Sequence, residues 1–147
     1  MEKIEIRKKN NDGSYSTSPY LFDAVDLYNG DVVKSIIEIS PIGNTVKNVK
    51  FTLSCLKDGI EYDLEPVNED SYELVTDRYK GMSIWFADKN GIKFKPDKNG
   101  VVSITNTLAV PIDLQIWLRA EKYTVEKLNE TIVLDDFNLK VWTQDAI

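Results

Sequence analysis

The chain contains no histidine and only one cysteine among its 147 residues. Without histidine, a serine or cysteine nucleophile lacks its usual general base, and zinc lacks its common nitrogen ligand. Cys55 has no second cysteine for an intrachain disulfide. Its even spacing from Val49, Phe51 and Leu53 predicts a small, buried apolar side chain in a strand. We therefore expect no enzymatic activity, no cofactor and no metal site.

Long apolar runs and a basic charge balance are also missing. No segment reaches the roughly 20 apolar residues of a membrane-spanning helix. The start Met1-Glu2-Lys3 lacks the basic, apolar and small-residue order of a signal peptide. A net charge of −6 disfavours nucleic acid as a partner, because phosphate contacts need a basic surface. These absences predict a protein that is made in the cytoplasm and binds neither membrane nor nucleic acid.

What the sequence does contain is a series of short strand patterns separated by turn residues. The expected strands lie at residues 4–6, 32–39, 49–55, 60–64, 72–76, 82–87, 102–104, 112–118, 131–134 and 137–142. The one helix candidate is 120–128. About ten short strands and at most one short helix predict an all-β fold. We expect a β-sandwich, immunoglobulin-like or jelly-roll-like, with residues 1–147 forming a single domain.

Residues 1–31 are expected to form an N-terminal strand followed by an arm. The segment 14–31 is rich in turn residues and carries Tyr15, Tyr20 and Tyr28. It could pack as a loop through its own aromatic side chains, cover other aromatic residues, or become ordered only on binding.

Two runs of Asp-Lys-Asn-Gly, at 88–91 and 97–100, resemble fragments of a calcium-binding loop. Such a loop requires a glutamate at its twelfth position. That position is Asn99 for the first run and Leu108 for the second. The two runs are therefore predicted to be hairpin turns.

The three tryptophans are the most informative residues of the sequence. Trp85, Trp117 and Trp142 each follow strand alternation onto the side opposite a row of apolar residues, and so off the core face. Tryptophan and arginine are enriched where one protein meets another. We therefore predict Trp85, Trp117 and Trp142, supported by Arg119, as interface or ligand-binding residues. The alternative is that a loop or the N-terminal segment covers them as a second small cluster.

The opening residues from Lys3 to Tyr15 (Lys-Ile-Glu-Ile-Arg-Lys-Lys-Asn-Asn-Asp-Gly-Ser-Tyr) resemble the start of a known class of virion proteins. These are small tail, baseplate or capsid-accessory proteins from phages of low-GC Gram-positive bacteria. The short strands and Asn-Gly turns that follow are similar to immunoglobulin-like sandwiches of virions. The resemblance implies a structural protein of the virion, made in the host cytoplasm, whose partners are other virion proteins and copies of itself. The charged strand from Lys3 to Lys9 is a candidate for strand pairing at an exposed sheet edge.

Two hypotheses compete with assembly. In a carbohydrate-binding β-sandwich module, the tryptophans would stack on a cell-surface glycan while Asp113, Gln115 and Asn138 accept hydroxyl hydrogen bonds. In an enzyme, two carboxylates would act together, and the chain has 24 acidic residues. Adjacent acidic residues such as Glu69 and Asp70 face opposite ways in a strand, which disfavours the second of these hypotheses.

Overall fold

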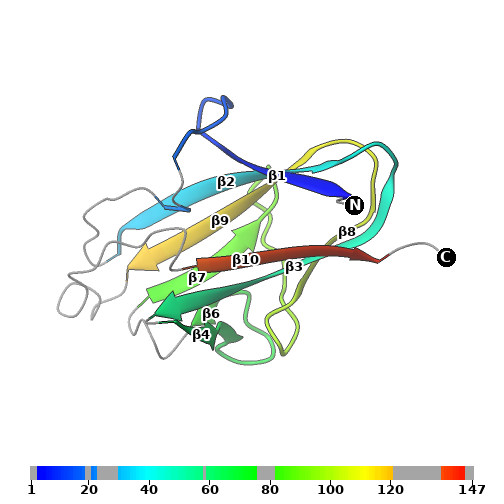
Figure 1. Cartoon of the computed structure of the whole chain (residues 1–147). Coiled ribbons are helices and arrows are strands. Elements are labelled where there is room, and N and C mark those ends of the chain that lie inside the picture. Colours follow the sequence, from blue (N-terminus) through cyan, green and yellow to red (C-terminus); the bar gives the residue numbers. More distant parts are fainter. Residues whose placement is uncertain are drawn as a thin grey trace.

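The structure is a computed structural model that describes residues 3–18, 21–22, 30–57, 59–75, 82–120 and 137–144. All regular secondary structure in these residues is β, with ten strands in two open antiparallel sheets that pack as a β-sandwich (Figure 1). The predicted all-β class is confirmed. The helix candidate 120–128, beyond its first residue, and the strand expected at 131–134 lie outside the described residues. No described helix is long and apolar enough to cross a membrane.

The larger sheet has six strands, in the spatial order β1-β2-β9-β7-β6-β5. Their bounds are β1 Ile4–Lys9, β2 Val32–Pro41, β9 Ile112–Ala120, β7 Met82–Ala87, β6 Leu74–Val75 and β5 Glu65–Pro66. The charged first strand therefore lies at an edge of the sheet. The long strands β2, β9 and β7 lie side by side next to it and are antiparallel to one another.

The smaller sheet is built around β3 (Val46–Lys57). Along one edge β3 pairs with β10 (Phe137–Gln144). Along the other edge it pairs first with β8 (Val102–Leu108) and then with β4 (Ile60–Asp63), which follow each other on that edge. β3 and β4 follow each other in the chain and pair antiparallel, so they form a hairpin.

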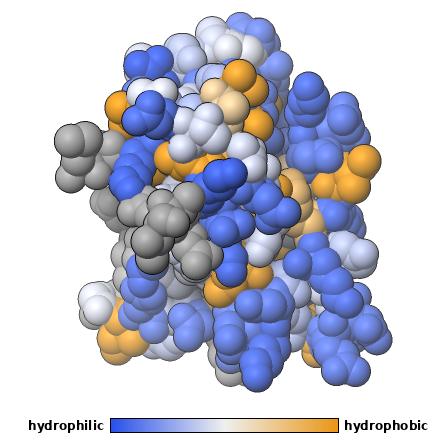
Figure 2. Space-filling view, turned by 90° about the vertical axis from the view of Figure 1, so that its right-hand side faces the viewer, coloured by the Kyte–Doolittle hydropathy of each residue, from blue (hydrophilic) through white to orange (hydrophobic). Residues whose placement is uncertain are grey.

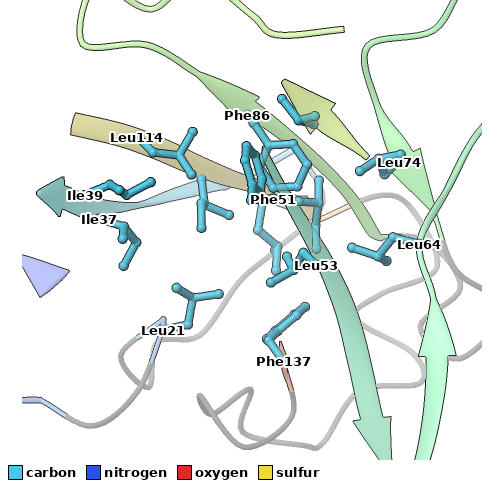
Figure 3. Packing of buried hydrophobic residues seen from close by; sticks show 14 of the residues in the cluster. Leu21, Ile37, Ile39, Phe51, Leu53, Leu64, Leu74, Phe86, Leu114 and Phe137 are labelled. Atoms are coloured by element: carbon cyan, nitrogen blue, oxygen red, sulfur yellow. The ribbon is translucent and has the colours of Figure 1, made fainter. Parts of the chain in front are cut away.

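The core lies between the two sheets and is lined by the inward rows of both (Figure 3). The predicted row on β3, which ends in the buried Cys55, is at most 1% exposed. Phe51 of β3 and Phe86 of β7 meet edge to face across the two layers, with ring centroids 4.6 Å apart and an interplanar angle of 88°. Edge-to-face aromatic pairs add to the apolar burial that holds the layers together.

A bulge in β3 lets this strand bury more than simple alternation allows. Val46 and Val49 are both buried although their spacing is odd. Between them Asn48 adopts a positive φ of 51°, and the pairing with β10 shifts register here, since Trp142 opposes Lys50 but Gln144 opposes Lys47. Asparagine tolerates this conformation better than most residues. The extra residue resets the side-chain parity, so that both valines face the core.

Part of the segment 14–31 is anchored in the sandwich. Leu21 and Phe22 are 1% and 3% exposed, and the Phe22 ring meets the Phe137 ring edge to face at 5.8 Å. Tyr15 instead lies on the outer side of the larger sheet, where it bridges to Lys9. Tyr20 and Tyr28 lie outside the described residues.

Candidate functional site on the outer face of the larger sheet

Trp85 and Trp117 lie directly opposite each other on the neighbouring strands β7 and β9. Their rings are stacked, with an interplanar angle of 3° and centroids 5.9 Å apart. Both side chains are partly exposed on the outer face, because Ile84, Phe86 and Ile116 take the buried side of the same strands. Strand alternation and the register of β7 against β9 therefore combine to form one aromatic pair.

Three cationic groups surround this pair. Lys34, which opposes Trp117 from β2, has its Nζ 5.4 Å from the centroid of the Trp117 ring. On the other side, the Nζ of Lys93 lies 4.7 Å from the centroid of Trp85, and the Cζ of Arg119 lies 5.2 Å from it. Cations over indole rings are attracted by the negative ring faces. We call these five side chains the cation–tryptophan surface.

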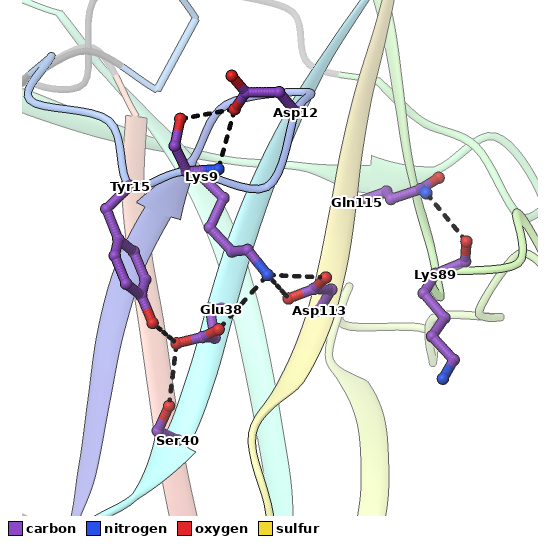
Figure 4. Close-up of polar contacts among 9 residues, drawn as sticks. Lys9, Asp12, Tyr15, Glu38, Ser40, Lys89, Asp113 and Gln115 are labelled. Atoms are coloured by element: carbon purple, nitrogen blue, oxygen red, sulfur yellow. Dashed lines mark hydrogen bonds and ion pairs between the residues drawn. The ribbon is translucent and has the colours of Figure 1, made fainter.

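Hydrogen bonds and an ion pair fix the side chains of this surface. The indole Nε1 of Trp117 donates to Oε1 of Gln115 at 3.0 Å. The Gln115 amide in turn donates a long hydrogen bond of 3.5 Å to the Lys89 carbonyl (Figure 4). Arg119 Nη2 lies 2.8 Å and 3.0 Å from the two carboxylate oxygens of Glu73, and both side chains are about a quarter to a third exposed. The surface is therefore ordered before any partner arrives, which lowers the entropic cost of binding.

A polar network lies beside this surface, over β1, β2 and β9 (Figure 4). Lys9 Nζ lies 3.1 Å from Oδ1 of Asp113 and 3.4 Å from Oε2 of Glu38. The Tyr15 hydroxyl donates to Oε1 of Glu38 at 2.8 Å, and the Ser40 hydroxyl donates to the same oxygen at 3.4 Å. The hydrogen bond from Tyr15, helped by Lys9, holds the pKa of Glu38 below its ordinary value. The hydrogen bond to Asp113 raises the pKa of Lys9. These carboxylates are thus compensated by neighbours and hold the strands together.

The structure brings three of the four predicted site residues together and separates the fourth. Trp85, Trp117 and Arg119 share the cation–tryptophan surface, whereas Trp142 lies on the outer face of the smaller sheet opposite Lys50. All three tryptophans lie off the core face as alternation predicted, and Trp142 is 40% exposed. Loop coverage of the tryptophans by the N-terminal segment is not seen in its described residues, since Tyr15 packs near Arg7 and Glu38 instead.

Sequence reasoning missed Lys34, Lys93 and Glu73. Alternation along the strand at 32–39 already puts Lys34 on the polar side. The missing information was that β2 lies next to β9, which brings Lys34 opposite Trp117. Lys93 and Glu73 come from segments that flank β7 and β6, and no local pattern links them to the tryptophans.

The two Asp-Lys-Asn-Gly runs form turns, as predicted, and they use their aspartates internally. Oδ1 of Asp88 accepts hydrogen bonds from the backbone N–H groups of Asn90 (2.8 Å) and Ile92 (3.0 Å). Oδ1 of Asp97 accepts hydrogen bonds from the backbone N–H groups of Asn99 (2.8 Å) and Val101 (3.0 Å). Over the described ranges, no group of three or more histidine, cysteine, aspartate or glutamate side chains is placed to hold a metal ion.

Comparison with known proteins gives no family. No family model matches the chain, and no curated protein matches it. Among solved structures, it is similar to AvmM, which catalyses macrocyclization in alchivemycin A biosynthesis, at 8% identity and a TM-score of 0.44, covering 99% of this chain and 89% of that one. It is also similar to a family 123 glycoside hydrolase from Clostridium perfringens, at 10% identity and a TM-score of 0.44. The match covers 99% of this chain but only 25% of the hydrolase. At such low sequence identities and TM-scores, the two similar structures say nothing about what this chain binds or catalyses.

Proposed function

We propose that this chain is a structural protein without enzymatic activity that assembles with other proteins through its cation–tryptophan surface. The observation that carries the proposal is the ordered pair of partly exposed tryptophans with Arg119 beside it. Tryptophan and arginine dominate the binding energy of protein interfaces when they lie together near the centre of a contact. The side of the molecule in Figure 2 is mostly hydrophilic, with small, separate apolar patches.

The charge of the surface indicates an acidic partner. Lys34, Lys93 and Arg119 contribute three positive charges, of which Glu73 compensates one. The chain as a whole carries a net charge of −6. An acidic region of another copy, or of a neighbouring protein, is therefore attracted to this surface, and such complementarity favours correct docking and fast association. A contact between two different regions of identical chains generates rings or filaments.

A phage virion is the setting we propose for this assembly, with synthesis in the host cytoplasm. Support comes from the resemblance of residues 3–15 to small virion proteins. In the structure, this opening forms the edge strand β1, a turn at Gly13 with φ of 92°, and the aromatic Tyr15. Neighbouring virion proteins are then the natural partners of the outer face.

A cell-surface glycan is the competing partner. A sugar ring stacks on the open face of an aromatic ring. Here Lys34 lies over the Trp117 ring, Lys93 and Arg119 lie over the Trp85 ring, and the two indoles stack on each other. With ring faces occupied in this way, protein contact is the better use of the surface.

Self-association measured by light scattering behind size-exclusion chromatography tests the proposal. We expect the average mass of the wild type to rise with concentration. Trp117→Ala should weaken this association by roughly 30-fold, because a central interface tryptophan contributes about 2 kcal/mol or more. Trp142→Ala is the matched control, since it removes an exposed tryptophan from the opposite sheet.

Two results would contradict the proposal. Equal association of Trp117→Ala and wild type would exclude the cation–tryptophan surface as the contact. A strict monomer at every concentration would exclude self-assembly. If its tryptophan fluorescence then responded to one member of a polysaccharide panel, the glycan would be the partner.

A further inference from the structure

The backbone groups of β1 form hydrogen bonds on both edges of the strand, with different residues on each edge. On the side of β2, the Lys3 carbonyl accepts a hydrogen bond from the Ile42 N–H at 2.9 Å. On the opposite side, the Lys8 carbonyl accepts one from the Ser16 N–H at 2.9 Å. Backbone groups alternate between the two sides of an antiparallel strand. The even-numbered residues of β1 therefore direct their N–H and C=O groups away from β2.

One stretch of this outer edge is open in the described part of the chain. Tyr15 and Ser16 pair with the Lys8–Lys9 end of β1, and no described strand pairs with the outer side of Ile4 or Ile6. Ile6 opposes the fully buried Ile39, so its side chain lies on the inner side of the sheet, yet it is 41% exposed. The unpaired N–H and C=O groups of an edge strand are a template for pairing with another chain.

We propose that a second copy of this chain covers the open stretch by adding its own β1 antiparallel, with the two Glu5 residues opposite each other at a two-fold axis. Ile4 of each copy then opposes Ile6 of the other and exchanges both backbone hydrogen bonds with it. The isoleucine side chains of both copies meet on the inner side of the joined sheet. This inference rests on the proposed function only in that both concern assembly, and it uses a different surface.

Steric and chemical limits select this register. Antiparallel pairing requires an even-numbered residue opposite another even-numbered one, because only those backbone groups face outward. Centring the pair on Ile6 would bring Ile4 of the second copy opposite Lys8, where Ser16 already occupies the edge. Centring it on Ile4 would oppose Ile6 with Glu2 instead of with an isoleucine. The register centred on Glu5 opposes Ile4 with Ile6 in both copies, covers the exposed Ile6 in each, and brings only Glu2 of the second copy, which precedes β1 in the sequence, opposite Lys8.

The charges on the outer side of β1 alternate in sign along the strand, from Lys3 through Glu5 to Arg7. Arg7 is ion-paired with Glu5 within one copy. Across the axis, Arg7 opposes Lys3 of the second copy, and both Glu5 carboxylates lie between these cations. Like charges that face each other directly destabilise the pair, and the diagonal contacts from each carboxylate to the cations of the other copy oppose that effect.

The dimer would also present the cation–tryptophan surface twice. The two-fold axis of an edge-to-edge antiparallel pair runs perpendicular to the sheet, so the outer faces of both copies lie on the same side. A partner with two matching sites would then bind with higher avidity than either site gives alone.

Cysteine cross-linking tests the register directly. At the two-fold axis, the two Glu5 residues would form a non-hydrogen-bonded pair with Cα atoms about 4.5 Å apart, which suits a disulfide. Mild oxidation of Glu5→Cys should therefore give a covalent dimer. Arg7→Cys is the matched control, because its two thiols would lie roughly 13 Å apart along the strands and should not join. The native Cys55 is fully buried and does not compete.

Light scattering supplies the second test and guards against artefacts of cross-linking. Ile6→Pro removes an N–H that faces away from β2, so the fold keeps its internal hydrogen bonds. Ile6→Lys places a charge in the joined apolar cluster, and Ile60→Lys is its control, because Ile60 is 55% exposed on the distant β4. We expect a wild-type dimer, at least tenfold weaker dimerisation for both Ile6 variants, and no change for Ile60→Lys.

The inference is overturned if Glu5→Cys gives no more dimer than Arg7→Cys, or if Ile6→Lys dimerises like the wild type. Trp117→Ala separates it from the proposed function. That variant should still form the Glu5→Cys cross-link when the two substitutions are combined. Loss of larger assemblies with retention of the cross-link, or the reverse, identifies which of the two surfaces has failed.

Discussion

The two Asp-Lys-Asn-Gly turns offer a matched pair for measuring one backbone contact. Gly91 and Gly100 have nearly the same φ, +81° and +79°, and each N–H donates to the carbonyl of the aspartate three residues earlier, at 3.0 Å and 2.9 Å. They differ in surroundings. A Cβ on Gly91 would have no atom within 4 Å, whereas a Cβ on Gly100 would lie 2.6 Å from the backbone oxygen of Leu64. Leu64 is 2% exposed, so this carbonyl has little room to move.

Replacing each glycine with alanine should therefore have unequal effects. Gly91→Ala carries only the cost of a left-handed conformation, about 1–2 kcal/mol in the free energy of unfolding. Gly100→Ala carries the same cost and adds an overpacking cost of about 1–3 kcal/mol against Leu64. Urea unfolding of both variants at low protein concentration, followed by tryptophan fluorescence, measures the difference. Equal destabilisation of the two variants would refute the close approach of the turn to Leu64.

Two further variants probe the N-terminal segment. Tyr15→Phe removes the hydrogen bond that lowers the pKa of Glu38 from its ordinary 4.5, so the stabilisation it removes is present above that pH and is lost as pH falls. Urea unfolding should therefore separate Tyr15→Phe from wild type more at pH 7 than at pH 3, and a constant difference would contradict this. Phe22→Ala should lower the unfolding free energy by about 3–4 kcal/mol, because Phe22 is 3% exposed and packs on Phe137. A loss below 1 kcal/mol in the same assay would show that residues 21–22 do not belong to the core.

Local sequence rules predicted the all-β class and the positions of the long strands. Turn residues and period-2 patterns located the strands, because a strand with one buried face must alternate. The row from Val49 to Cys55 is buried throughout, as expected. The same rules placed the start of that strand at residue 49, which is three residues too late, because they do not foresee a bulge. Asn48 resets the parity and extends β3 back to Val46.

The site depended on information that no local rule contains. In the sequence, the three tryptophans look equivalent, since each lies opposite a row of apolar residues on its own strand. Alternation decides which side of a strand a residue takes, but not which sheet the strand joins. The chain passes from β7 through β8, in the smaller sheet, and returns as β9, so that β7 and β9 become neighbours. β10 joins the smaller sheet instead, which places Trp142 on the opposite side of the sandwich.

The pairing of β7 with β9 also explains why strand alternation predicted the side of the strand that Trp85 and Trp117 take. A single extra residue in either strand would have turned one indole into the core, as the bulge at Asn48 turns Val46 inward. The register from Met82↔Ala120 to Ala87↔Gln115 is continuous, with no such shift. Parity read from the sequence is therefore preserved across both strands, and Trp85 and Trp117 must reach the same face. The stacking of the two indole rings and the positions of the cations around them depend, in addition, on the long-range pairing of β2, β9 and β7.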